Sequence, residues 1–193
     1  MVTIGILALQ GAFREHEEML DRINVGHFLI RKANDLKSSM DGLIIPGGES
    51  TTIGKLLLEL GLYDTLREKI IAGLPVFGTC AGMILLANSL KDDPTRHLQV
   101  MDICVKRNAY GRQLGSFFTV DKFGESDVPM TFIRAPYIDS VGNGVEVLSE
   151  VNGHIVAARQ KNVLVTSFHP ELNTDTTVHT YFVEKIVKPY VHK

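Results

Sequence analysis

Short apolar runs alternate with amphipathic segments through the first half of this 193-residue chain. The apolar runs predict buried strands, and the segments with apolar residues about 3.6 positions apart predict helices. Strands are expected at residues 2–9, 28–30, 43–45 and 75–78, and helices at 12–23, 51–60, 62–72 and 81–90. Because a strand, a helix and a second strand in succession form a parallel crossover, this alternation predicts a parallel sheet with helices on both faces.

The second half of the chain has a different pattern. Strands are expected at residues 98–106, 115–121, 130–139, 145–151, 154–160 and 163–168, followed by a helix at 174–187. Asn152-Gly153 lies between two of these strands and favours a type I′ hairpin, so part of this half is antiparallel. Without repeats or a long linker, the two halves predict one domain over residues 1–193. Its fold class is α/β: a flavodoxin-like three-layer domain with a mostly parallel central sheet and additional antiparallel strands.

Charge and cysteine content narrow the classes of function. Lys and Arg total 20 and Asp and Glu total 22, which disfavours binding to nucleic acid or to an acidic membrane surface. No stretch reaches the ~18 uncharged apolar residues of a membrane-spanning helix. The two cysteines, Cys80 and Cys104, cannot form a disulfide framework and fit a reducing compartment. We therefore expect a cytoplasmic protein. The histidines other than His169 show no metal-ligand spacing, so no metal and no cofactor are expected.

Residues 78–82, Gly-Thr-Cys-Ala-Gly, come between a predicted strand and a predicted helix. This is the context of a nucleophile elbow, in which small residues leave room for a sharp turn around the nucleophile. A helix start favours the thiolate of Cys80, and the N–H of Ala81 points toward a developing oxyanion. The alternative interpretation is a small buried cysteine in a glycine-rich packing contact.

Residues 167–171, Ser-Phe-His-Pro-Glu, end the last predicted strand and offer a base for such a thiol. His169 and Glu171 are two positions apart, so on an extended chain they face the same way, and the carboxylate can orient the imidazole. Both this motif and the elbow end strands, where ligands of open α/β sheets bind. The alternative is an unrelated pair of surface residues.

Residues 46–52, Pro-Gly-Gly-Glu-Ser-Thr-Thr, form a third loop between strand and helix. A phosphate-binding P-loop is excluded because Gly48 and Gly54 are one residue too far apart and Leu56 replaces the required Ser or Thr. The Gly48 N–H could instead be a second oxyanion donor; the alternative is a turn in which Ser50 or Thr51 caps the helix. Arg107 and Arg134 could bind a carboxylate, although Arg134, within a predicted strand, also fits a surface salt bridge.

Together these motifs resemble the class I, triad-type glutamine amidotransferases. Within that class they resemble the branch of glutaminase subunits of pyridoxal 5′-phosphate synthase, which serves vitamin B6 biosynthesis. The matching stretches run almost from end to end of the chain: residues 7–11, 46–51, 78–82, 107–113, 132–136 and 168–172. The cysteine and His-x-Glu motifs belong to the whole class, whereas the stretches at 7–11, 46–51 and 107–113 indicate the vitamin B6 branch.

The resemblance implies a glutaminase that hydrolyses L-glutamine to glutamate and ammonia through a cysteinyl thioester. In this interpretation Cys80, His169 and Glu171 are the catalytic triad, and Gly48 and Ala81 donate to the oxyanion. The expected substrate-binding residues are Gly48, Glu49, Ser50, Arg107, Ile133 and Arg134. Gln10 and Gly11 are expected to couple the site to a partner.

The implied partner is a separate (β/α)₈ synthase subunit that receives the ammonia within a large hetero-oligomer. Three alternatives remain open at this point. They are an amidotransferase subunit for another pathway, a cysteine hydrolase or protease with the same sheet, and a regulatory module without turnover. Proteases of that kind commonly have His directly after the cysteine, where this chain has Ala81.

Overall fold

The computed structural model describes residues 2–107 and 116–191. Its main sheet has 10 strands in the order β2-β1-β3-β4-β12-β11-β9-β6-β5, with β10 paired to β11 outside this path. The strands are β1 (Thr3–Leu7), β2 (Gly26–Ile30), β3 (Gly42–Ile45), β4 (Val76–Thr79), β5 (Ala87–Leu90), β6 (Met101–Lys106), β9 (Tyr137–Val141), β10 (Glu146–Val151), β11 (His154–Gln160) and β12 (Val163–Thr166). A separate hairpin joins β7 (Ser116–Phe123) to β8 (Ser126–Ile133).

The strand directions confirm the predicted fold class. Strands β2, β1, β3, β4 and β12 pair in parallel, whereas β11, β9 and β10 add antiparallel partners on one side. The positive φ angles of Asn152 and Gly153, 52° and 75°, are those a type I′ hairpin requires. The parallel strands place the ends of β3, β4 and β12 along one edge of the sheet, where the predicted loops follow them.

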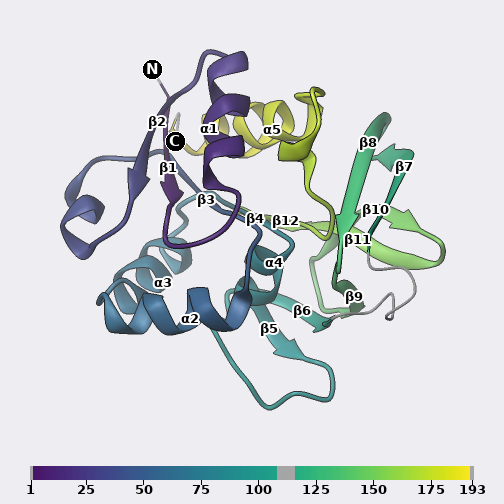
Figure 1. Ribbon diagram of the computed structural model, residues 1–193, viewed down its shortest axis with the longest axis horizontal. Coiled ribbons are helices and arrows are strands. Elements are labelled where there is room, and N and C mark those ends of the chain that lie inside the picture. The colour runs from purple at the N-terminus through teal and green to yellow at the C-terminus, as the bar shows by residue number, and fades with distance from the viewer. Residues whose placement is uncertain (1, 108–115, 192–193) are drawn as a thin grey trace.

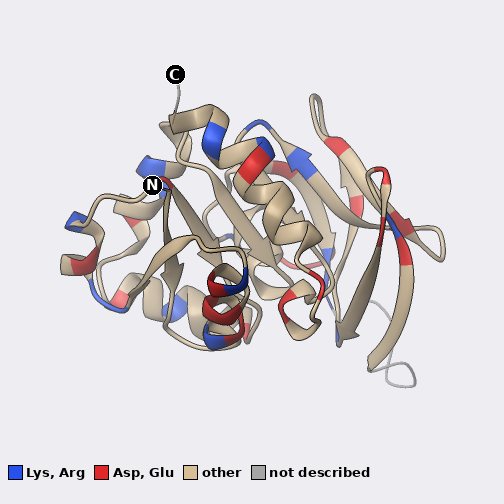
Figure 2. Ribbon diagram, turned by 90° about the horizontal axis from the view of Figure 1, so that it is seen from above, with Lys and Arg blue, Asp and Glu red and all other residues tan. Residues whose placement is uncertain are grey.

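Helices cover both faces of the sheet (Figures 1 and 2). Below it in Figure 1 lie α2 (Ser50–Glu59), α3 (Tyr63–Ile71) and α4 (Ala81–Leu86), and above it lie α1 (Phe13–Arg22) and α5 (Thr177–Phe182). Both faces need covering because successive side chains of a strand point to opposite sides of the sheet, and both sides are apolar. In β3, Leu43 and Ile45 pack in the core with α2–α4, and Ile44 packs in the opposite core with α1 and α5. The chain ends in a π-helical turn, η3 (Val183–Val187), and α6 (Lys188–Val191).

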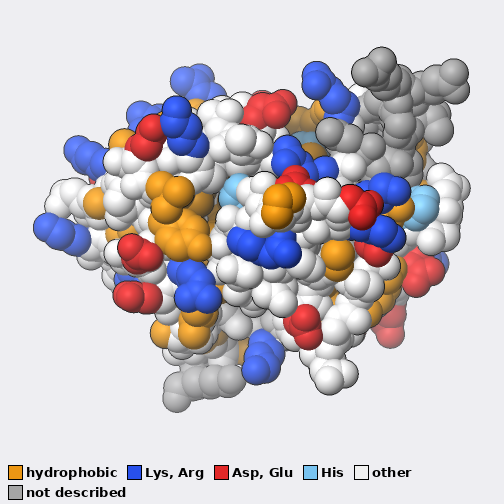
Figure 3. All heavy atoms as spheres, turned by 90° about the horizontal axis from the view of Figure 1, so that it is seen from below, with side chains coloured by type: hydrophobic (Ala, Val, Ile, Leu, Met, Phe, Trp, Pro, Cys, Tyr) orange, Lys and Arg blue, Asp and Glu red, His pale blue; other side chains and the backbone are white. Residues whose placement is uncertain are grey.

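The surface over α2 and α3 carries basic and acidic side chains interspersed with small apolar patches (Figure 3). Its exposed apolar residues include Leu58, Leu60 and Ile71. Among residues 2–107 and 116–191, no helix is long and apolar enough to cross a membrane.

The bounds of three predicted elements were clearly wrong, and the strand expected at 98–106 begins only at Met101. The helix expected at 81–90 ends at Leu86, and the rest is β5, which pairs with β6. All of α4 is buried, so its sequence lacks the polar face whose spacing would have marked the helix end. The strand expected at 130–139 begins earlier, at Ser126, and is broken at residues 134–136 into β8 and β9, which belong to different sheets. The last helix begins at Thr177 rather than at 174, and it contains a π-helical turn.

Candidate active site

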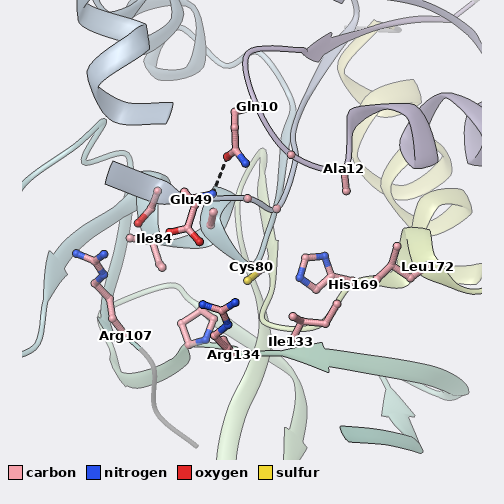
Figure 4. A pocket seen from close by; sticks show the side chains of 16 residues that line it. Gln10, Ala12, Glu49, Cys80, Ile84, Arg107, Ile133, Arg134, His169 and Leu172 are labelled. Atoms are coloured by element: carbon pink, nitrogen blue, oxygen red, sulfur yellow. Dashed lines mark hydrogen bonds between the residues drawn. The ribbon is translucent and has the colours of Figure 1, made fainter. Parts of the chain in front are cut away.

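Cys80 lies at the sharp turn between β4 and α4, as the motif predicts. Its backbone has φ 49° and ψ −99°, a conformation that residues with side chains rarely adopt. The flanking glycines are required by close packing, because a Cβ on Gly82 would lie 2.1 Å from the Ile45 oxygen and one on Gly78 would lie 2.7 Å from the Gly82 carbonyl carbon. The Cys80 N–H donates to the Thr166 oxygen at 2.7 Å, which holds the turn against β12. The residue is 8% exposed, and its sulfur faces the cavity shown in Figure 4.

His169 and Glu171 follow β12 and lie beside each other. The distance between His169 Nδ1 and Glu171 Oε1 is 2.7 Å, and Glu171 is buried. The two side chains are close as predicted, but the extended backbone that was expected to bring them together is not found. Residues 170–172 form a 3₁₀ turn, η2 (Pro170–Leu172). Pro170 fixes its own φ near the helical value, which favours a turn start, and the turn brings the carboxylate back toward the ring.

The surroundings of His169 favour its charged form. Burial lowers its pKa, but hydrogen bonds to Cys80 and Glu171 and the negative charges of both outweigh burial and raise the pKa to about 10. At neutral pH the ring is therefore an imidazolium between a sulfur and a carboxylate. Since Nδ1 contacts Glu171, Nε2 is the nitrogen that remains for Cys80.

A cavity of about 420 Å³ brings the predicted site residues together (Figure 4). Its lining includes every predicted site residue except Glu171, which lies behind His169. The predicted residues that line it are Gln10, Gly11, Gly48, Glu49, Ser50, Cys80, Ala81, Arg107, Ile133, Arg134 and His169. The cavity is also lined by Ala12, Ile84, Pro136 and Leu172, to which sequence reasoning gave no role. Pro136 and Leu172 end two of the matching motif stretches and Ala12 follows a third, whereas no spacing points to Ile84.

Hydrogen bonds to neighbouring segments hold the glycine loop after β3. The Gly47 N–H donates to Thr79 Oγ1 at 2.9 Å, the Gly47 oxygen accepts from the Ala12 N–H at 3.0 Å, and the Glu49 N–H donates to Gln10 Oε1 at 2.7 Å. The His169 ring packs so closely on this loop that a Cβ on Gly47 would lie 2.3 Å from its Cε1. Helix α2 has Glu49 at its N-cap position without a side-chain cap, so the alternative of a Ser50 or Thr51 cap is wrong.

The two arginines reach the cavity from different elements. Arg107 follows β6 and is held by Asp93, at 3.1 Å, and by the Thr51 hydroxyl, at 3.3 Å. Residues 108–113 of its motif lie outside the described residues. Arg134 is not within a strand, as the sequence predicted; it follows β8 with φ 42° and is exposed. Its backbone leaves the extended conformation there because the chain passes from the hairpin to the main sheet.

Comparison with known proteins assigns this chain to a family. The chain matches the SNO glutamine amidotransferase family over residues 6–188. It belongs to that family. The resemblance seen in the sequence motifs is thereby confirmed at the level of the class.

Relatives within the SNO glutamine amidotransferase family are similar over nearly the whole chain. The pyridoxal 5′-phosphate synthase subunit PdxT of Desulfitobacterium hafniense strain Y51 is 56% identical, across 95% of this chain and 92% of the relative. The protein of the same name from Streptococcus pneumoniae strain ATCC 700669 is 55% identical, across 93% and 95%.

Solved structures agree with the family assignment. A crystal structure of a glutamine amidotransferase superposes with a TM-score of 0.88 at 45% identity, covering 94% of this chain and 97% of that one. The structure of PurLQS from Thermotoga maritima has a TM-score of 0.66 at 13% identity, covering 99% of this chain and 98% of the matched one, and shares the fold.

Proposed function

We propose that this SNO-family chain is the glutaminase subunit of a pyridoxal 5′-phosphate synthase. It hydrolyses L-glutamine and passes the ammonia to a separate synthase subunit. One observation carries the proposal: the Cys80 sulfur and the His169 ring face one cavity, and Glu171 holds the far side of that ring at 2.7 Å. The names of the relatives favour the vitamin B6 pathway over another amidotransferase pathway.

The reaction begins at the sulfur. Paired with the His169 imidazolium, the Cys80 thiolate attacks the side-chain amide carbon of glutamine. His169 gives its proton to the amide nitrogen, the carbon–nitrogen bond breaks, and ammonia leaves a glutamyl thioester. Neutral His169 then takes a proton from water, whose oxygen displaces the sulfur and releases glutamate. A positioned acid and base of this kind contributes roughly 10²–10⁴-fold in rate.

Two backbone N–H groups are proposed as oxyanion donors. The Ala81 N–H follows the nucleophile directly, and the Gly48 N–H belongs to the loop that faces it across the cavity. The hydrogen bond from Ala12 to the Gly47 oxygen fixes the orientation of the peptide that carries the Gly48 N–H. Each donor is expected to contribute about 3–4 kcal/mol to stabilising the transition state.

The rest of the cavity suits a small zwitterion. Arg107 and Arg134 offer guanidinium groups to the α-carboxylate of glutamine, and Glu49 offers a carboxylate to its α-ammonium group. Ser50 and Ile133 complete the proposed substrate contacts. The side-chain amide is then directed toward Cys80, between the two proposed oxyanion donors.

The partner follows from the chemistry of ammonia, which is lost if it reaches water. We propose that the acceptor is a (β/α)₈ synthase subunit, that the two chains form a large hetero-oligomer in the cytoplasm, and that neither nucleic acid nor a membrane takes part. Gln10 and Gly11 support a coupling role because they lie at the cavity and contact the glycine loop. A change at these residues on docking would reach the proposed oxyanion donor directly.

Replacement of Cys80 by Ala tests the proposed function. Glutamate release in the presence of the synthase subunit is expected to fall to background in Cys80→Ala, because the covalent route is lost, while thermal unfolding stays similar. Cys104→Ala is the matched control, since Cys104 lies in β6 and outside the cavity. A Cys80→Ala protein that keeps more than a few per cent of the wild-type rate would refute the nucleophile assignment.

A further inference from the structure

A row of buried polar side chains lies behind the catalytic residues, between α1, β4 and α5. His16 of α1, Thr79 at the end of β4 and His179 of α5 are each 0% exposed. His16 Nδ1 lies 2.9 Å from His179 Nε2, and His16 Nε2 lies 3.3 Å from Thr79 Oγ1. Burying polar groups costs free energy unless they are hydrogen-bonded, so a row of this kind needs a structural or functional reason.

Two members of this row, Thr79 and His16, lie against groups of the proposed active site. Thr79 Oγ1 accepts the Gly47 N–H at 2.9 Å, which fixes the loop carrying the proposed oxyanion donor. His16 Nε2 also lies 3.7 Å from Glu171 Oε2, the carboxylate oxygen that does not contact His169. Within the described part of the chain, that buried oxygen has no hydrogen-bond partner, and His16 Nε2, 3.7 Å away, is a candidate donor to it.

Both histidines of the row are neutral. Burial is the largest cause that holds the pKa of His16 well below its ordinary value, and the positive charge of the His169 imidazolium lowers this pKa further. Burial lowers the pKa of His179 to about 3. Each ring therefore carries one N–H, and the row has two possible proton arrangements.

The hydrogen-bond partners favour one arrangement. If His179 Nε2–H donates to His16 Nδ1, then His16 Nε2–H faces Thr79 and Glu171, and the unpaired His179 Nδ1 is a lone pair. In the reverse arrangement, His179 Nδ1–H is a buried donor without a partner among the described residues, and the lone pair of His16 Nε2 faces the carboxylate oxygen at 3.7 Å. Unpaired buried N–H groups are rare, and a nitrogen lone pair facing a buried carboxylate is repelled by it whereas an N–H is attracted, so the first arrangement is favoured.

We infer that His16 is a positioning residue for the glutaminase reaction, a role that rests on the proposed function. Its Nε2–H, oriented by His179, faces the free oxygen of Glu171 and the Thr79 hydroxyl that holds Gly47. One side chain thus aligns the carboxylate behind His169 and the loop that carries the proposed oxyanion donor. His16 lies on α1, which begins at Phe13, just after Gln10 and Gly11. It therefore also links the proposed coupling segment to the Glu171 carboxylate and to the loop that carries the proposed oxyanion donor.

Two amide variants of different length test this inference. The His16→Gln amide reaches the place of Nε2 and keeps a donor there, whereas the shorter His16→Asn amide reaches only the place of Nδ1. Glutaminase kcat and KM are measured with the synthase subunit at saturation. His16→Asn is expected to lower kcat about 10- to 100-fold, by analogy with lost orienting partners at other sites, with KM changed less than about threefold. His16→Gln is expected to retain at least about fivefold more kcat than His16→Asn.

Two further measurements separate positioning from general loosening of α1. Leu20→Ala removes a buried side chain of the same helix that does not belong to the row, so it is expected to lower Tm while kcat stays near wild type. Thr79→Val, which removes the hydroxyl, is expected to lower kcat more than Thr79→Ser, which keeps it. If His16→Asn does not fold, the comparison of kcat between Thr79→Val and Thr79→Ser still tests whether the Thr79 hydroxyl of the row supports catalysis.

Equal kcat in the two His16 variants, or in the two Thr79 variants, would overturn the inference. A loss of kcat in Leu20→Ala as large as that in His16→Asn would also overturn it. These outcomes differ from failure of the proposed function itself. In that case the wild type would release no glutamate, or Cys80→Ala would release as much as the wild type.

Discussion

Cys80 keeps a backbone conformation that is unfavourable for a residue with a side chain. Its φ of 49° and ψ of −99° are expected to cost about 1–3 kcal/mol, which the surrounding packing has to offset. The close contact of Gly82 with Ile45 and the hydrogen bond from Cys80 to Thr166 fix the backbone of the turn in this conformation. In this conformation the Cys80 sulfur faces the cavity, on the side of His169.

His169 gives the first prediction. In ¹³C-histidine NMR, its ring is expected to stay protonated through neutral pH and to titrate near pH 10, and Glu171→Gln is expected to lower that pKa by removing one of the charges that raise it. Glu184→Gln is the control, because Glu184 pairs with Lys188 on the exposed side of the last helix. A wild-type midpoint near 6.5 would contradict the ion pair.

The same proton links stability to pH. The folded pKa of about 10 exceeds the ordinary histidine pKa of 6.5, so the protonated ring stabilises the fold fully below about pH 6.5. This contribution is lost as the pH rises through 10. The free energy of unfolding of the wild type, compared with His169→Gln by urea titration, should show an advantage that shrinks over this interval. An advantage that grows with pH would contradict the assignment.

Loops from four strands meet at one edge of the sheet. The segment after β1 contacts the loop after β3, which in turn contacts Thr79 at the end of β4 and the His169 ring after β12. Gly11 is the tightest of these contacts, because its φ is +103° and a Cβ there would lie 1.9 Å from the Gly47 oxygen. The glycine therefore sets the distance between the segment after β1 and the loop after β3.

Gly11→Ala tests this arrangement of loops. The added methyl group has to displace the Gly47 oxygen, so kcat for glutamate release is expected to fall at least about tenfold as an oxyanion donor moves. Gly61→Ala is the control, since Gly61 also has a positive φ, +66°, but has nothing within 4 Å of an added Cβ. A Gly11→Ala protein with wild-type kcat would show that this contact does not position the loop.

Element boundaries were predictable where an amphipathic face or a turn residue marks them. Helices α2 and α3 appear within about two residues of their predicted limits, because polar faces and Gly61 define them. The boundary between α4 and β5 was not predictable, since α4 is apolar on every side. The break between β8 and β9 depends on a change of sheet at Arg134, which is a tertiary event.

At the scale of the molecule, the sequence indicates where the site forms but not how it is supported. The three loops were predicted because each combines small or ionisable residues with the end of a strand. The row of His16, Thr79 and His179 was not predicted, since its members lie 63 and 163 positions apart and have no characteristic spacing. Only the packing of α1 and α5 on the same face brings the two histidines together.

The proposed dependence on the synthase partner is a property of the whole assembly. The isolated chain is expected to release glutamate slowly and to turn over faster when the synthase subunit is added, because in the proposed coupling the partner docks at Gln10 and Gly11 and fixes the Gly47–Gly48 loop. Glutamate release measured across a titration of the synthase subunit checks this. Equal turnover with and without the partner would exclude this coupling.

Covalent labelling tests the central claim most directly. The wild type is incubated with its synthase partner and with a glutamine analogue that carries a diazo ketone in place of the amide, and its peptides are mapped by mass spectrometry. We predict one label per chain, on Cys80, with loss of glutamate release in parallel and no label on Cys104 or on Cys80→Ala. Inactivation with the label on another residue, or glutamate release that continues after Cys80 is fully labelled, would contradict the nucleophile assignment.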